Sequence, residues 1–198
     1  MLRICASLIL VLVVLLRPTP VFAEKISFIR DTEIENTIRA YATPLFEAAG
    51  LDPTAVRIYV VADKQINAFV AGGQNLFINT GLITRSAGAE QIIGVIAHEV
   101  GHIEGGHLSR VNDALKRSTA ESILAFVLGA AAAAAGRPDV GGAVIAGGQG
   151  MAMRTFFQYS RTQEGAADAA AMRYHDATGQ SARGLRELFN ILGGEELL

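Results

Sequence analysis

The stretch from Ser86 to Gly105 constrains the fold more than any other part of the sequence. It is predicted to be a helix, because its apolar residues recur at helical spacing around most of its surface: Ile92, Ile93, Val95, Ile96, Val100 and Ile103. A helix that is apolar nearly all round cannot face water, so we expect it to be buried. The polar residues His98, Glu99 and His102 within it therefore require a chemical explanation.

His98 and His102 are the ends of an H-E-x-x-H pattern, which supplies one explanation. Residues four apart on a helix are offset by only about 40°, so both imidazoles can converge on one ion. Zinc favours such nitrogen ligands in tetrahedral geometry, and Glu99 could take a proton from a water that the metal activates. The alternative is a pair of buried histidines satisfied by backbone groups, which is a costly arrangement.

Two histidines leave a zinc site one protein ligand short, and the sequence offers two sources for the third. His107 misses by one residue the extended pattern H-E-x-x-H-x-x-G-x-x-H, which would place its histidine at 108. The glycines at 105 and 106 could bend the chain, so His107 stays a minor candidate as a ligand; otherwise it supports a ligand or lies at the surface. Glu164 is the better candidate, and Asp168, one helical turn on, could hydrogen-bond a ligating histidine.

Around this helix the sequence predicts a further helix and several short strands. Residues 31–49 form an amphipathic pattern that Asp31 or Thr32 can cap, with Gly50 past its end. Three β-rich runs follow at 58–61, 68–70 and 76–78, and 72–75 is the turn joining the last two. We therefore expect an α+β domain, mainly helical, with a small antiparallel sheet beside the H-E-x-x-H helix and a last helix around 182–192.

The N-terminal 23 residues resemble an export signal rather than part of this fold. Arg3 is followed by an apolar run at 4–16 and by small residues up to Ala23, the sites a signal peptidase reads. The run is short for a membrane span, although an uncleaved anchor is the alternative. We expect a signal peptide at 1–23 and a metallopeptidase-like domain at 24–198, which contains no cysteine once Cys5 is removed.

The overall composition excludes several classes of function. The 17 basic and 19 acidic residues give a net charge of −2, which argues against a nucleic-acid partner. A single cysteine excludes an internal disulfide and a multi-cysteine metal site. The sequence also lacks a G-x-S-x-G nucleophile elbow and a phosphate-binding glycine loop.

Residues 123–153 are rich in alanine and glycine, and we expect two short helices joined by a turn near Gly136 and Pro138. Each helix is too short to cross a bilayer unaided. Small residues permit close packing, so a buried hairpin is one interpretation. The other is a mobile lid or a membrane-contacting hairpin near the metal.

Several short blocks follow one another in order between Ile58 and Gly179: Asn67-Ala68-Phe69, Asn79-Thr80-Gly81-Leu82-Ile83, the His98–His102 pattern continued to His107-Leu108, and Tyr159-Ser160-Arg161 followed by Glu164 and Asp168. In order and spacing these blocks resemble the M48 peptidases, the family of the Ste24- and HtpX-like gluzincins. The resemblance is greatest to the periplasmic, BepA-like branch of that family.

The resemblance implies a zincin-type domain and a zinc-dependent endopeptidase with one Zn²⁺ per chain. It implies that His98, His102 and Glu164 are the zinc ligands. Glu99 would be the general base, and Asp168 would be a supporting acid of the catalytic site.

The resemblance also implies a substrate cleft, a location and partners. The strand carrying Asn67, Ala68 and Phe69 would form an edge of the cleft, where an extended peptide adds as a β-strand. The substrates would be unfolded or misassembled proteins in the periplasm, with outer-membrane assembly machinery as a partner and peripheral contact with the membrane. The role would be quality control of periplasmic or outer-membrane proteins.

The sequence departs from the family pattern in three respects. Ala166 and Ala169 stand where family members often carry a glutamate and an arginine. BepA-like proteins have a C-terminal tetratricopeptide-repeat domain, and we expect none before the sequence ends at Leu198. A later histidine that can occupy the open zinc position in that branch has no assignable counterpart, although His175 is available.

Arg161, His107 and His175 are the candidates for stabilising an oxyanion.

A function of another class is compatible with the same motifs. The chain could be a non-proteolytic periplasmic chaperone or assembly factor with a structural or silenced zinc site. The intact Glu99 argues against this alternative, because a structural site has no use for a base.

Overall fold

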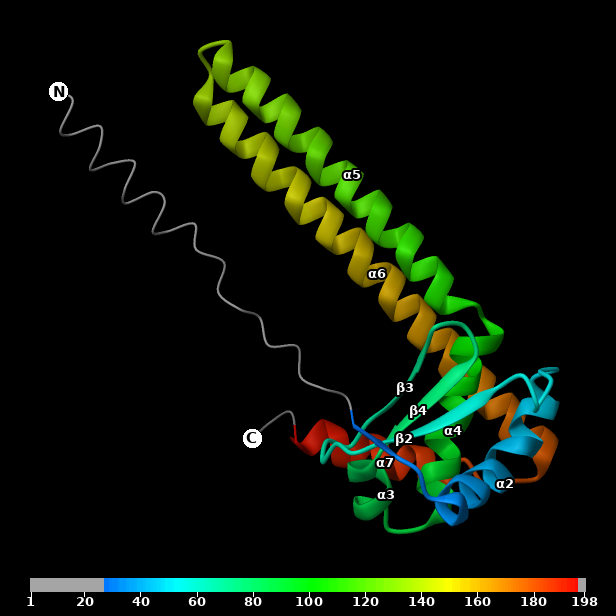
Figure 1. Ribbon diagram of the computed structural model, residues 1–198. Coiled ribbons are helices and arrows are strands. Elements are labelled where there is room, and N and C mark those ends of the chain that lie inside the picture. Colours follow the sequence, from blue (N-terminus) through cyan, green and yellow to red (C-terminus); the bar gives the residue numbers. More distant parts are fainter. Residues whose placement is uncertain (1–26, 196–198) are drawn as a thin grey trace.

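The computed structural model describes residues 27–195, so the predicted signal peptide lies outside the described residues. The strands are β1 (Phe28–Ile29), β2 (Arg57–Val61), β3 (Ala68–Ala71) and β4 (Asn75–Asn79). The helices are α2 (Thr32–Ala48), α3 (Thr80–Arg85), α4 (Ala89–Glu104), α5 (His107–Ala134), α6 (Pro138–Thr178) and α7 (Arg183–Glu195). The expected α+β, mainly helical class is confirmed (Figure 1).

Helix α2 begins and ends where its sequence signals predict. The Asp31 side chain accepts hydrogen bonds from the backbone N–H groups of Glu33 and Ile34, so Asp31 is the N-cap. Gly50, just beyond the helix, has a left-handed φ of 68°. The apolar face of α2 enters the core through Ile38, Ala42, Leu45 and Phe46.

The sheet is mixed, so the expectation of an antiparallel sheet is wrong for its central pair. The strand order is β1-β2-β4-β3: β3 and β4 form the predicted antiparallel hairpin, but β2 and β4 run parallel. Leu76 and Ile78 of β4 are fully buried, whereas β3 is mostly half-buried. β4, which carries the larger buried side chains, therefore takes the inner position, and β3, which precedes it in the chain, is left at the edge.

Helix α4 is buried as its sequence predicts. It packs against α6, α7, α2 and the edge strand β3, and its core residues Ile96, Ala97 and Val100 are fully buried. The polar residues of the H-E-x-x-H pattern are thus held on a helix that packs against neighbours on several sides.

Helices α5 and α6 form a long hairpin that extends away from the sheet and the shorter helices (Figure 1). The turn falls between Ala134 and Pro138, near the predicted break. The two helices are longer than expected, because the polar segments 107–122 and 154–178 continue them toward the body of the protein. Within residues 27–195, no helix is both long and apolar enough to traverse a bilayer.

Candidate metal and catalytic site

The two histidines of the pattern face the same point in space. His98 and His102 lie one turn apart on α4, and their Nε2 atoms are 3.1 Å from each other. Their side chains are only 12% and 14% exposed. The convergence that the spacing predicts is therefore present in the folded chain.

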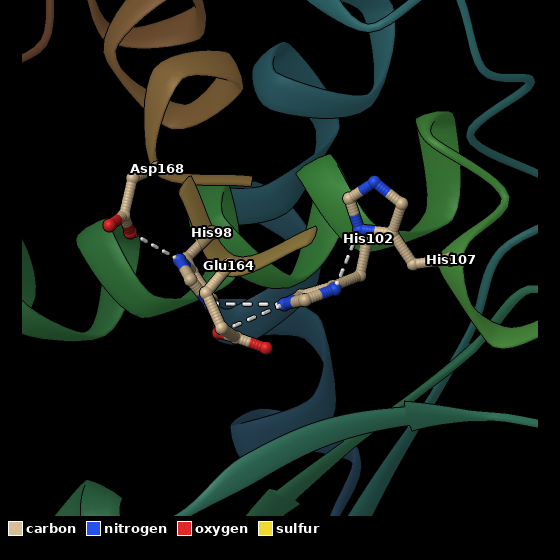
Figure 2. A network of polar contacts seen from close by, with 5 residues as sticks. All are labelled: His98, His102, His107, Glu164 and Asp168. Atoms are coloured by element: carbon tan, nitrogen blue, oxygen red, sulfur yellow. Dashed lines mark hydrogen bonds and ion pairs between the residues drawn. The ribbon is translucent and has the colours of Figure 1, made fainter. Parts of the chain in front are cut away.

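Helix α6 adds the carboxylate of Glu164 to this pair (Figure 2). Its Oε2 lies 3.3 Å from Nε2 of His98 and 3.6 Å from Nε2 of His102. The approach of α6 to α4 depends on Gly101, because a Cβ there would lie 2.9 Å from both Cα and the carbonyl oxygen of Ala167. Gly101, which lies between the two histidines and directly before His102, thus lets the two helices come close enough for all three side chains to meet.

The three converging atoms fit a zinc ion in both spacing and chemistry. Ligand atoms about 2.05 Å from zinc at the tetrahedral angle are separated by about 3.3 Å, close to the distances between these three side-chain atoms. Two imidazole nitrogens and a carboxylate oxygen are also a common donor set for catalytic zinc. A tetrahedral ion held by them keeps one position for water or substrate.

Asp168 orients the first histidine, as the sequence predicts. Its Oδ1 accepts a hydrogen bond from Nδ1 of His98 at 2.8 Å. The proton is therefore on Nδ1, and the lone pair on Nε2 faces the cluster, the tautomer that metal ligation requires. Glu164 and Asp168 lie one turn apart on α6, so one helix supplies both carboxylates.

The second histidine is supported by His107, in one of the two roles that the sequence left to that residue besides ligation. His107 is buried at 5% exposure, and its Nδ1 lies 2.9 Å from Nδ1 of His102. When Nε2 of His102 offers its lone pair to the cluster, Nδ1 of His102 donates its proton to His107. His107 reaches this position because Gly106 adopts a left-handed φ of 59° between α4 and α5. His107 is one residue short of the position that the extended zinc pattern requires for a ligand, but at this position it can hydrogen-bond the ligating His102.

The imidazole of His102 is held in its neutral form. Burial, followed by repulsion from His98, lowers the pKa of His102, and burial also lowers the pKa of His107. A neutral imidazole is the form that can ligate a metal.

Glu99 lies beside the cluster without being one of its three donors. It is 9% exposed, and burial, together with the nearby Glu164 carboxylate, raises the pKa of Glu99 to about 8. A backbone hydrogen bond from Val70 of β3 acts in the opposite direction. A carboxyl group with a pKa near neutrality can both take up and return a proton.

A cavity connects Glu99 with the edge strand. Asn67 and Ala68 line it together with His98, Glu99 and Phe189. Of the residues that the family resemblance marks for substrate binding, Asn67 and Ala68 therefore border the site. Phe69 does not line this cavity: its ring stacks on Phe77 at 4.9 Å between centroids, on the opposite face of the sheet.

The other histidine considered in the sequence analysis lies outside the cluster. His175, on α6, is 1% exposed, and neither ring nitrogen has a hydrogen-bond partner among the described residues. Burial lowers the pKa of His175, as expected for an imidazole enclosed in the core. It makes no polar contact with the three converging side chains.

Comparison with known proteins gives a family match that covers most of the chain. Residues 29–198 match the sequence model of peptidase family M48. This range includes all the converging side chains described above.

Individual relatives are more distant. The chain is 25% identical to a putative beta-barrel assembly-enhancing protease of Vibrio cholerae, over 84% of this chain and 34% of that protein. It is 24% identical to the beta-barrel assembly-enhancing protease of Escherichia coli K12, over 76% of this chain and 31% of that protein. It is 25% identical to the beta-barrel assembly-enhancing protease of Yersinia pestis, with the same coverage of both chains. The chain thus spans about a third of the length of these relatives.

Proposed function

The chain belongs to peptidase family M48, and from this premise we propose that it is an exported zinc endopeptidase that hydrolyses peptide bonds in unfolded or misassembled proteins. The observation that carries the proposal is the convergence of His98, His102 and Glu164, with a fourth ionisable group, Glu99, beside them but outside the donor set. A purely structural metal site would need no such group.

In this proposal His98, His102 and Glu164 hold one zinc ion. The ion would polarise the scissile carbonyl and lower the pKa of a water at the same centre. Asp168 keeps the Nε2 lone pair of His98 directed at the centre, and His107 does the same for His102. The fixed tautomers reduce the reorganisation that binding would otherwise require.

Glu99 acts as the general base and then as the general acid. Its carboxylate takes the proton of the attacking water and later delivers it to the nitrogen of the leaving amine. Burial keeps the basicity of Glu99 high enough for this exchange, and its position between the cluster and β3 places it next to a peptide in the cavity.

The substrate lies along β3 in an extended conformation. Within the described sheet β3 is an edge strand, paired through β4 alone, so its outer main-chain groups can hydrogen-bond another strand. Ala68 would contribute through its outward main-chain groups and Asn67 by lining the cavity, whereas the main chains of Asn67 and Phe69 face β4. Main-chain recognition suits unfolded proteins, because it does not depend on one side-chain sequence.

The names of the relatives support a place in outer-membrane protein assembly. They are described as beta-barrel assembly-enhancing proteases, and this chain matches about a third of their length. We propose that this chain acts in the periplasm after export by residues 1–23, on proteins destined for the outer membrane.

Zinc content and casein cleavage by the wild type and Glu99→Gln test the proposal. We expect about one zinc per chain in both proteins, and a loss of cleavage of about 10²- to 10⁴-fold in Glu99→Gln. Glu90→Gln is the matched control, because it makes the same change at an exposed site on the same helix. Zinc in both proteins with cleavage in neither would favour the assembly factor instead, and a wild type without zinc would refute both functions.

A further inference from the structure

The distal half of the α5–α6 hairpin has small residues at its helix–helix interface. A Cβ on Gly148 would lie 2.1 Å from Cβ of Ala125, and one on Gly141 would lie 2.4 Å from the carbonyl oxygen of Gly129. The helices are therefore in backbone contact at these positions, and Ile145 packs over Gly129, where a Cβ would lie 2.4 Å from its Cγ1.

Seven large apolar residues of the same segment are exposed instead of packing at the interface. Each is more than half exposed: Ile123 59%, Leu124 59%, Phe126 60%, Val127 56%, Leu128 54%, Met151 65% and Met153 55%. A helical hairpin in water normally buries residues of this kind at its interface. Small residues inside and large apolar residues outside are typical of helices packed in lipid.

The distribution of charge follows the same division. Segments 122–136 and 140–153 contain no ionisable side chain. Nearer the body of the protein, both helices carry exposed basic residues: Lys116 and Arg117 on α5 and Arg154 on α6. The helices are antiparallel with Ala125 opposite Gly148, so these three residues lie at about the same height along the hairpin. Between residues 110 and 121 and between 154 and 161 there are five basic residues and two acidic ones, although the whole chain has a net charge of −2.

We propose that residues 122–153 dock on an anionic phospholipid bilayer, with Lys116, Arg117 and Arg154 at the level of the headgroups. The three basic side chains are attracted to the negatively charged lipid headgroups, and the uncharged residues beyond them can enter the region where headgroups meet acyl chains. Fifteen helical residues extend about 22 Å, which is less than the thickness of the hydrocarbon core, about 30 Å. The hairpin therefore inserts from one side of the bilayer and does not cross it. The charges of Arg137 and Asp139 at the turn favour an oblique orientation, with the turn near the headgroups.

Docking in this way fixes where the metal and catalytic site lies relative to the membrane. Arg154 and Glu164 are on the same continuous helix, α6, ten residues apart. At 1.5 Å per residue, Glu164 lies about 15 Å from Arg154 along the helix axis, so an obliquely docked hairpin would hold the site within about 15 Å of the lipid surface. Lipid binding itself does not depend on proteolysis, so the proposal stands or falls separately from the proposed enzymatic function.

A single-tryptophan probe tests the proposal, because the chain contains no tryptophan. Phe126→Trp, in the exposed apolar segment, is compared in the full chain with Phe28→Trp, which is 48% exposed on β1. With vesicles of phosphatidylcholine and phosphatidylglycerol, we expect Phe126→Trp emission to shift to the blue and to be quenched by lipids brominated in their acyl chains. Phe28→Trp should not change.

Three results of the tryptophan experiment would overturn the proposal. They are the absence of a shift in Phe126→Trp, an equal shift in both variants, and a shift of Phe126→Trp that grows with protein concentration in the absence of lipid. The last result would assign the surface to a second copy of the chain.

The basic residues are tested by replacing Lys116, Arg117 and Arg154 together with glutamine. Each basic side chain near an anionic surface contributes about fivefold to partitioning, so the triple variant should bind anionic vesicles roughly 100-fold more weakly at low salt. The control makes the same change at three exposed basic residues of the body: Arg30, Arg57 and Lys64. Equal losses in the two triple variants, or no loss in either, would contradict a specific role for the hairpin.

Discussion

Gly101→Ala should weaken zinc binding although Gly101 touches no metal. The added Cβ would lie 2.9 Å from Cα and the carbonyl oxygen of Ala167. Carbon atoms in ordinary contact are about 3.5–4.0 Å apart, so α4 and α6 must separate by about 0.6–1 Å at this crossing. The two histidines are on α4 and Glu164 is on α6, one turn from Ala167, so the separation acts directly on the ligand set.

Zinc sites tolerate ligand displacements of only about 0.2 Å. We therefore expect the affinity of Gly101→Ala for zinc to fall about 10- to 100-fold, the range found when the support of a ligand is lost. Overpacking should also lower the free energy of unfolding by about 1–3 kcal/mol, offset by up to about 1 kcal/mol from the greater helix propensity of alanine. Competition with a chromogenic chelator measures the affinity, and urea unfolding with and without zinc measures the stability.

Gly165→Ala is the matched control, because Gly165 follows Glu164 on α6 and a Cβ there meets nothing within 4 Å. It should keep the zinc affinity of the wild type and gain about 0.5–1 kcal/mol in the free energy of unfolding. Wild-type zinc affinity in Gly101→Ala would refute the claim that this crossing sets the ligand geometry. A loss of affinity in Gly165→Ala as large as in Gly101→Ala would show that any alanine in these helices has the effect.

Three further substitutions test the surroundings of the cluster. Asp168→Asn should lower zinc affinity about 10- to 100-fold in chelator competition, because an amide can present its N–H to Nδ1 of His98 and favour the wrong tautomer; unchanged affinity would contradict the orienting role. His107→Ala should lower zinc affinity by about tenfold while leaving one zinc per chain at saturation, and loss of the bound ion at saturating zinc would instead make His107 a ligand. Tyr174→Phe removes the hydrogen bond from its hydroxyl to the half-exposed Glu104 carboxylate, so urea unfolding should show a loss of about 1 kcal/mol with zinc affinity retained. Equal stability of Tyr174→Phe and the wild type would show that this link between α6 and α4 contributes nothing.

The elements that the sequence predicted well are those determined by local patterns. Helix α2 has a cap, a periodic apolar face and a terminal glycine, and α4 has an apolar surface that could only be buried. The convergence of His98 and His102 follows from helix geometry alone. Glu164 and Asp168 were found because a histidine pair needs a third ligand and an orienting group.

The features that were missed depend on tertiary contacts. Whether β2 pairs with β3 or with β4 is decided by which strand is buried more deeply, and the short apolar runs do not encode that order. Residues 140–153 were expected to form a short helix of their own, but they are the first part of a 41-residue helix, which close packing against α5 stabilises although glycine lowers helix propensity. For His107 the sequence left support of a ligand and a place at the surface as alternatives, and the choice depends on the left-handed backbone of Gly106, which brings His107 to His102.

The measurement that tests the central claim most directly is a zinc titration of the metal-free chain. Zinc is removed with a chelator and added back in steps, and casein cleavage is followed at each step. The account predicts no cleavage without metal, a rise that ends at one zinc per chain, and no rise in Glu99→Gln although that variant binds the same amount. Cleavage by the metal-free chain, or full zinc loading of the wild type without any cleavage, would contradict it.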